Sequence, residues 1–134
     1  MAWATSTCTV RRWWMVPYPG AENLGAGINT AHGDDLPYIA PDESYLIFAS
    51  DRPGGYGGRD LYVSYRSDAR WSVPQNLGPA INTAAWELYP SVSPDGRYLF
   101  LTRRPGGWDA TDDSDIYWIR VTIIERLRSS ARWG

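Results

Sequence analysis

The chain has 134 residues, which is enough for one modest domain with a workable core. Its 13 basic residues are all arginine and face 15 Asp and Glu, and the net charge of −2 excludes the basic footprint of a nucleic-acid-binding protein. Eight Trp, nine Tyr, 13 Gly and 10 Pro favour a β-rich protein with frequent turns. No segment approaches the roughly 20 apolar residues that a membrane helix needs.

The N-terminal segment gives no targeting signal. Cys8 is the only cysteine, so an internal disulfide and a cysteine-rich metal site are excluded. Arg11 and Arg12 follow the mildly apolar part of this segment, whereas a signal peptide places its charges first. We therefore expect a soluble polypeptide with no visible export signal and no membrane insertion.

Two similar stretches follow one another along the chain. The first begins at Glu22 and reads ENLGAGINTAHGDDLPYIAPDESYLIFASDRPGG. The second begins at Gln75, 53 residues later, and reads QNLGPAINTAAWELYPSVSPDGRYLFLTRRPGG. Relative to the first copy, the second lacks one residue before RPGG and has a few additional residues before DIY, which corresponds to DLY in the first copy. Because order and spacing hold over roughly 40 positions, we interpret the stretches as an internal repeat.

Each repeat predicts short strands separated by turns. Residues Tyr45–Ser50 and Tyr98–Leu101 are apolar at consecutive positions, which suits strands buried on both faces. Four strands in about 53 residues, with the inner ones covered on both sides, describe a β-propeller blade. The strands predicted for the first copy are Pro37–Ala40, Tyr45–Ser50, Asp60–Arg66 and Arg70–Val73.

The glycine-rich segment ASDRPGGYGGRDLY, residues 49–62, predicts a hairpin turn. A phosphate-binding loop needs a helix after its glycines, whereas β-branched and aromatic residues follow here. We expect Asp51 and Asp60 to tie down the backbone of this loop. The SPDG turn at residues 93–96 has Asp95 as an acceptor and a glycine that tolerates positive φ. In the first copy Glu43 replaces that glycine, which predicts a less relaxed turn.

These motifs also carry a family resemblance. SPDGRYLFLT, ASDRPGGYGGRDLY and NLGPAINT together resemble the WD-like β-propeller repeat of the TolB-like type, over roughly residues 22–121. The resemblance implies six- or seven-bladed propellers that act as binding scaffolds, mostly in the bacterial envelope, and hence a periplasmic or extracellular location. SDIYWIRVTIIERLR resembles the end of such chains, with a last inner strand and a short helix carrying Ile123, Ile124 and Leu127.

The predicted fold class is all-β: two four-stranded antiparallel propeller repeats, a partial third, and a short C-terminal helix. Residues 1–21 hold the partial blade, with RRWWMVP at residues 11–17 as its outermost strand and Trp14 on it. Residues 22–74 and 75–121 are the two repeats, and residues 122–134 the helix and tail. A closed propeller needs about four blades or more. We therefore expect a C-terminal fragment of a longer propeller, or a protomer that closes its ring by oligomerising.

Several residues are candidates for ligand contact. His32 is the only histidine, and Ala85 takes its place in the second copy, so we expect a solvated loop residue rather than a catalytic one. Trp86 and Trp108 lack aromatic counterparts, which makes them the better candidates for stacking on a sugar or peptide. Trp71 is expected to pack against its own blade.

The acidic residues allow two further interpretations. Asp34 and Glu87 occupy equivalent places, and paired carboxylates can serve a glycosidase, but recurrence in each repeat favours one structural bond per blade. The loop DATDDSD, residues 109–115, could bind a cation, yet it lacks the order of an EF-hand. Whether Asp109–Asp115 binds a cation stays open, and no cofactor is predicted. The recurring positions expected to serve the scaffold are Asp42, Asp95, Asp51, Asp60, Asp115, Asn23 and Asn76.

The sequence thus favours a non-catalytic propeller segment that presents loops to a protein partner. One alternative is a hydrolase acting on glycans or peptides. A second is a carbohydrate-binding module that uses Trp86 and Trp108.

Overall fold

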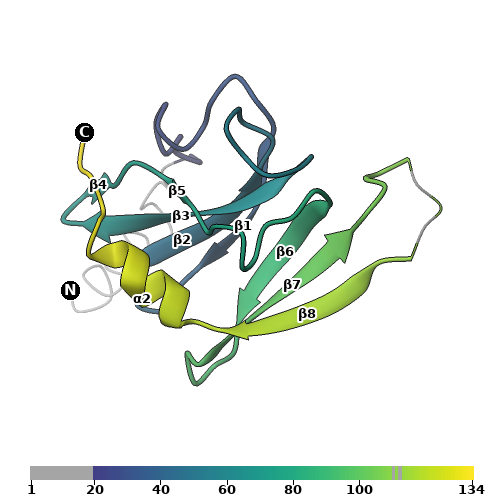
Figure 1. Cartoon of the computed structure of the whole chain (residues 1–134). Coiled ribbons are helices and arrows are strands. Elements are labelled where there is room, and N and C mark those ends of the chain that lie inside the picture. Colours follow the sequence, from purple (N-terminus) through teal and green to yellow (C-terminus); the bar gives the residue numbers. More distant parts are fainter. Residues whose placement is uncertain (1–19, 110, 112) are drawn as a thin grey trace, which may run out of the picture.

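The computed structural model describes residues 20–109, 111 and 113–134 as a mostly β molecule with two antiparallel sheets and one short helix (Figure 1). The all-β prediction is therefore confirmed. The strand expected at residues 11–17, together with Trp14 and Cys8, lies outside the described residues.

The first sheet is formed by the four strands of the first repeat and by one short strand at the start of the second. Its order is β1 (Asp34–Ile39), β2 (Tyr45–Ser50), β3 (Asp60–Ser67) and β4 (Arg70–Trp71), and the short β5 (Gln75–Asn76) also pairs with β3. The predicted strands are confirmed, although β1 begins three residues earlier than expected and β4 ends two residues earlier. Every residue of β2 after the first is buried, as its continuous apolar sequence predicts.

The second sheet has the order β6 (Trp86–Val92), β7 (Tyr98–Arg104) and β8 (Asp115–Arg120). The prediction of four strands in the second repeat is wrong for the described residues, because the chain passes from β8 into the helix α2 (Thr122–Arg128). The expected burial of β7 on both faces is also wrong, since Leu99 and Leu101 are buried whereas Phe100 between them is exposed.

Helix α2 returns from the second sheet to the first (Figure 1). Its apolar side chains recur at helical spacing, and Ile124 among them is fully buried. The Tyr65 hydroxyl of β3 donates a hydrogen bond to the Ile124 carbonyl, and the Gln75 side chain donates one to Leu127. This packing explains why the predicted C-terminal helix forms although it has only seven residues.

The main core lies between the two sheets and α2. One face of the first sheet packs against one face of the second, so that the apolar side chains of both faces are buried. A smaller cluster lies on the other side of the first sheet, where Phe48 and Tyr62 stack with ring centroids 6.1 Å apart. The main core residues are Ile47, Ala49, Leu61, Val63, Tyr65, Leu77, Ile81, Leu88, Val92, Leu99, Leu101 and Ile124.

The two repeats share the same backbone irregularities. The first strand of each sheet shifts register before a proline, and the residue ahead of that proline is left-handed: Leu36 has φ 52° and Tyr89 has φ 51°. Since proline cannot donate to a ladder, a bulge accommodates it. The next turn is equally matched, with φ 59° at Glu43 and 73° at Gly96. The first turn thus holds a non-glycine residue in a strained conformation, as the sequence predicts.

Candidate functional site

The carboxylate of Asp34 holds the loop that enters the first sheet. It accepts hydrogen bonds from the backbone N–H and the hydroxyl of Thr30, both at 2.7 Å, and from Ser50 Oγ at 2.6 Å. Arg52 Nη2 completes the set at 2.7 Å and also donates to the Ile28 carbonyl. Burial opposes the charge, yet the bonds from Ser50, Arg52 and Thr30 hold the pKa of Asp34 well below its usual range.

Glu87 does the same in the second repeat. It accepts from the N–H of Thr83 at 3.1 Å and from its hydroxyl at 2.5 Å, and Arg103 Nε donates to it at 3.0 Å. Arg103 also donates to the Ile81 carbonyl, the counterpart of Ile28. Arg103 lies directly opposite Glu87 in the ladder, whereas Ser50 lies opposite Asp34 and Arg52 is two residues further along the chain. Each carboxylate therefore stabilises the loop of its own repeat, which agrees with one structural bond per repeat.

The asparagines organise a second recurring network. Asn23 Oδ1 accepts from Gly25 N at 2.8 Å and from Asn29 Nδ2 at 3.1 Å, and Asn76 Oδ1 accepts at 2.8 Å from both Gly78 N and Asn82 Nδ2. Both networks close a tight turn with a left-handed glycine.

The second of these turns also binds the first sheet. Asn82 accepts from the Leu61 N–H at 2.8 Å and donates to the Leu61 carbonyl at 2.9 Å, so that its carboxamide mimics a strand neighbour. Asn76 Nδ2 donates to Asp60 Oδ2 at 2.8 Å. These bonds, with the pairing of β5 on β3, join the second repeat to the first.

The glycine-rich loop is a turn whose glycines permit close approach. Asp60 accepts from the N–H groups of Tyr56 and Gly57, as predicted. Asp51, by contrast, accepts from Gly33 N at 2.7 Å and so ties the loop before β1 rather than its own. A Cβ at Gly57 would collide with the backbone of residues 83–85, and one at Gly58 with the Trp86 ring. The loop therefore packs on the second repeat and offers no phosphate cradle.

The aromatic candidates differ in their surroundings. Trp86 is half-buried between the loop glycines, and the Arg59 guanidinium lies 5.4 Å from its ring centroid. Trp108 packs edge-on against Trp86 at 5.8 Å and against Tyr89 at 6.5 Å, and it is exposed. The structure thus brings the two predicted tryptophans together and leaves only Trp108 open to solvent. His32 lies exposed in the loop before β1.

The acidic loop before β8 is described only in part, because residues 110 and 112 lie outside the described residues. Asp115 occupies the place of Asp60 at the start of its strand, but it is exposed. Among the described residues, no asparagine occupies the place beside Asp115 that Asn76 has beside Asp60. Within residues 20–109, 111 and 113–134, no three His, Cys, Asp or Glu side chains gather to hold a metal ion.

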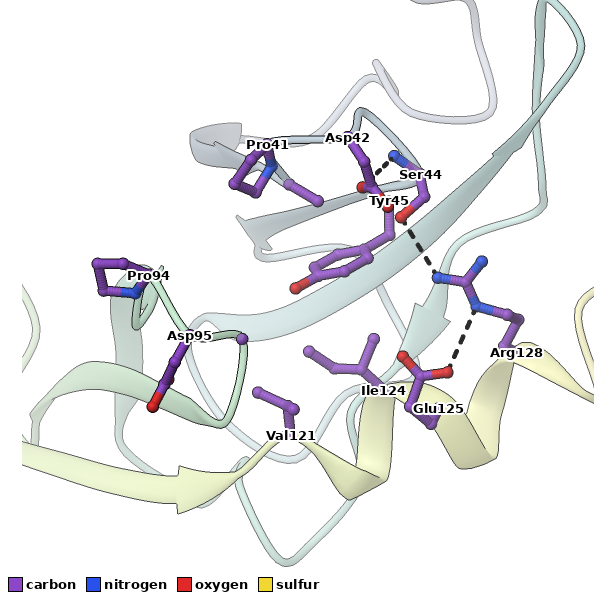
Figure 2. Close-up of a pocket in the computed structure, with 12 residues that line it drawn as sticks. Pro41, Asp42, Ser44, Tyr45, Pro94, Asp95, Val121, Ile124, Glu125 and Arg128 are labelled. Carbon is purple, nitrogen blue, oxygen red and sulfur yellow. Dashed lines mark hydrogen bonds and ion pairs between the residues drawn. The ribbon is translucent and has the colours of Figure 1, made fainter.

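A cleft lies where the turns of the two sheets meet α2 (Figure 2). On one side of the cleft, Arg128 donates a hydrogen bond to Ser44 and forms an ion pair with Glu125 at 3.8 Å. Tyr45 also lines the cleft, and burial raises the pKa of its hydroxyl to about 12. Each turn has an aspartate that accepts a hydrogen bond within it: Asp42 accepts one from Ser44 N at 3.0 Å, and Asp95 accepts one from Ser93 Oγ at 2.5 Å. Bonds from these serines lower the pKa of each aspartate. The carboxylates predicted as structural therefore fix two turns.

The strongest candidate surface is the outward side of the second sheet, which we call the open face and define by Phe100, Ile116 and Trp118. Phe100 lies directly opposite Trp118 in the ladder between β7 and β8, and all three side chains are exposed. Tyr98 packs edge-on against Trp118 at 5.3 Å. A contiguous set of large apolar side chains on one exposed face is typical of a binding surface.

Sequence reasoning missed the open face as a named set of residues. It named Trp86, Trp108 and His32 as the candidates for ligand contact instead. The signal was present in DIYWIR, residues 115–120, which is apolar on four consecutive positions and forms the last strand before the helix. A strand with apolar residues on both faces needs a neighbour on each side.

In the part of the chain that the structure describes, no helix has both the length and the apolar character needed to cross a bilayer. Comparison of the chain with protein-family models, with curated proteins and with solved structures finds no match.

Proposed function

We propose that this chain is a non-catalytic protein-interaction module made of two consecutive β-propeller repeats of the TolB-like type, which acts in the bacterial envelope. The location rests on the family resemblance alone. The observation that carries the function is the open face, where Phe100, Ile116 and Trp118 project from a sheet whose last strand has an unpaired edge among the described residues.

Leaving the open face in water costs free energy that a partner would recover. Burial of apolar area stabilises a complex by roughly 25 cal/mol per Å². Tryptophan is among the side chains that contribute most of the binding energy at protein interfaces. A free strand edge also offers N–H and C=O groups for pairing with an added strand. The open face and the β8 edge together provide both contributions.

The remaining polar groups support a non-catalytic role. Asp34 and Glu87, the carboxylates that a hydrolase would need, are both engaged in loop bonds within their own repeats. The glycine-rich loop packs on the second repeat. Asp60, Asn23 and Asn76 are likewise engaged in bonds within the scaffold.

A photo-crosslinking experiment tests this function. Benzoylphenylalanine at position 118 should capture a protein partner in cell extract, whereas the same label at Val73, an exposed apolar residue on the link between β4 and β5, should not. Phe100→Asp in the labelled chain should abolish the capture. Equal capture from positions 118 and 73, or none from either, would contradict the proposal.

One observation favours a carbohydrate-binding module as the second candidate. Tyr89 and Trp108 are both exposed and meet edge-on, an arrangement that can stack on a sugar ring. Binding to a glycan array that disappears in Trp108→Ala and survives in Trp133→Ala would support this alternative.

A further inference from the structure

The contact between the two repeats supplies an internal template for a further contact. In it, the turn of the second repeat, residues 76–83, docks on β3, and Asn82 binds both backbone groups of Leu61. Leu61 and Val63 then fill the space beside Leu77, Ile81 and Leu99 in the main core. One side of this contact is a strand with two projecting apolar side chains, Leu61 and Val63, which we call knobs. The other side is a turn with an apolar cleft.

The first side of this template recurs, unpartnered, on β8. Asp115, Ile116 and Trp118 correspond to Asp60, Leu61 and Val63. Leu61 and Val63 are fully buried, whereas Ile116 is 78% exposed and Trp118 is 63% exposed. We call this strand the tail surface. It has the knobs and the leading aspartate of β3, but no turn docks on it among the described residues.

The second side recurs at the turn of the first repeat, where no other described residue covers it. Leu24 and Ile39 correspond to Leu77 and Val92, and they are 43% and 46% exposed where their counterparts are 0% and 8% exposed. Asn29 corresponds to the buried Asn82 but is exposed. The bond from Asn29 Nδ2 to Asn23 Oδ1 at 3.1 Å fixes the turn in the conformation of its docked counterpart. We call residues 23–30 with Ile39 the head surface.

The head surface includes an apolar cleft. Leu24, Ile28, Pro37, Leu46 and Phe48 line it. Four of the five have counterparts that belong to the main core together with Leu61 and Val63, namely Leu77, Ile81, Leu99 and Leu101. The cleft therefore lies where the knobs of a preceding β3-like strand belong, and Ile116 and Trp118 are knobs of that kind.

We infer that the chain associates with a second copy of itself, head to tail, with the head surface of one copy docked on β8 of the other. This inference rests on the proposed function, since it names the occupant of the open face. Asn29 of one copy binds the backbone N–H and carbonyl of Ile116 in the other, as Asn82 binds Leu61. Asn23 donates to Asp115, which satisfies the carboxylate as Asn76 satisfies Asp60.

The second copy is the occupant because the chain itself carries the matching surface, which is already formed and which no other described residue covers. The head turn (purple) and β8 lie on opposite sides of the molecule, so a chain cannot join its own two surfaces (Figure 1). Such a heterologous contact gives a ring where the rotation closes and an open chain where it does not.

Sedimentation velocity of the purified full chain over a hundredfold concentration range tests the inference. The wild type should form species larger than the monomer as its concentration rises. Asn29→Asp, which damages the head, and Ile116→Asp, which damages the tail, should each leave a monomer with unchanged circular dichroism. Val73→Asp, which places the same charge on another exposed apolar site, should associate like the wild type.

Mixing the two damaged variants gives the sharper result. Asn29→Asp retains a tail and Ile116→Asp retains a head, so an equimolar mixture should form a dimer and nothing larger. A mixture that stays monomeric, or a wild type that stays monomeric at all concentrations, would overturn the inference. If the wild type is monomeric while the label at position 118 captures another protein, the proposed function stands and only the identity of the partner is wrong.

Discussion

The strands β3 and β8 occupy the same place in their repeats and differ in what surrounds them. On β3, a turn and the short β5 cover the outer edge, and the apolar side chains become fully buried. On β8, the chain leaves for α2 instead, and the side chains at the same positions remain in solvent. The comparison teaches that burial here depends on the following repeat and not on the strand itself.

The largest expected effect comes from removing the contact between Asn82 and Leu61 that joins the second repeat to β3. Asn82→Ala removes the acceptor of the buried Leu61 N–H, although Leu77 N still donates to the Leu61 carbonyl. An unsatisfied buried donor costs about 1–3 kcal/mol, and lost bonds to Asn76 and to the carbonyl add to it, so we expect a loss of about 3 kcal/mol. Urea unfolding followed by tryptophan fluorescence measures it.

The matched control is Asn29→Ala at a protein concentration where the chain is monomeric. Asn29 has the same partner within its turn but is exposed, so its loss should cost less than about 1 kcal/mol. Equal losses for the two variants would mean that the docked carboxamide does not join the repeats.

The second prediction compares the two arginines that neutralise the recurring carboxylates. Arg103→Met leaves the fully buried Glu87 with only the two bonds from Thr83. Removing one partner of a buried pair costs about 3–5 kcal/mol, and partial exposure of Arg103 places the expected loss at about 2–3 kcal/mol. Arg52→Met should cost less, because Ser50 still donates to Asp34. Chemical denaturation of both variants checks the order, and the reverse order would contradict it.

The sequence predicted most of this fold because its signals are local. The boundaries of β2 follow from YLIFAS, the turn at Glu43 from its alignment with Gly96, and the carboxylate bonds from their recurrence. The missed features depend on distant contacts. Nothing in ASDRPGG shows that Asp51 binds Gly33, and DIYWIR is equally compatible with a covered inner strand and with an open edge. Only the route of the chain after Arg120 decides between them.

The third prediction concerns pH. The pKa of Asp34 is lower in the folded chain than in the unfolded one, so its contribution to stability is present above the unfolded pKa of about 3.9 and is lost as the pH falls toward the folded pKa. Asp34→Asn should therefore be less stable than the wild type at pH 7 and lose less stability between pH 5 and pH 2. Thermal unfolding across that range measures both, and parallel curves for the two proteins would contradict the assignment.

The smallest expected effect separates the two strand-connecting turns. Glu43 and Gly96 are both left-handed, but only glycine adopts this conformation without strain. Glu43→Gly stabilises the fold by removing about 1 kcal/mol of backbone strain. It also destabilises the fold, because the exposed ion pair with Arg66 is lost and glycine raises the conformational entropy of the unfolded chain. We therefore expect a change within about 0.5 kcal/mol of zero, whereas Gly96→Ala should destabilise by about 1 kcal/mol. Because the two turns share geometry, a large loss in Glu43→Gly would show that the ion pair with Arg66, and not the backbone, decides the stability of the first turn.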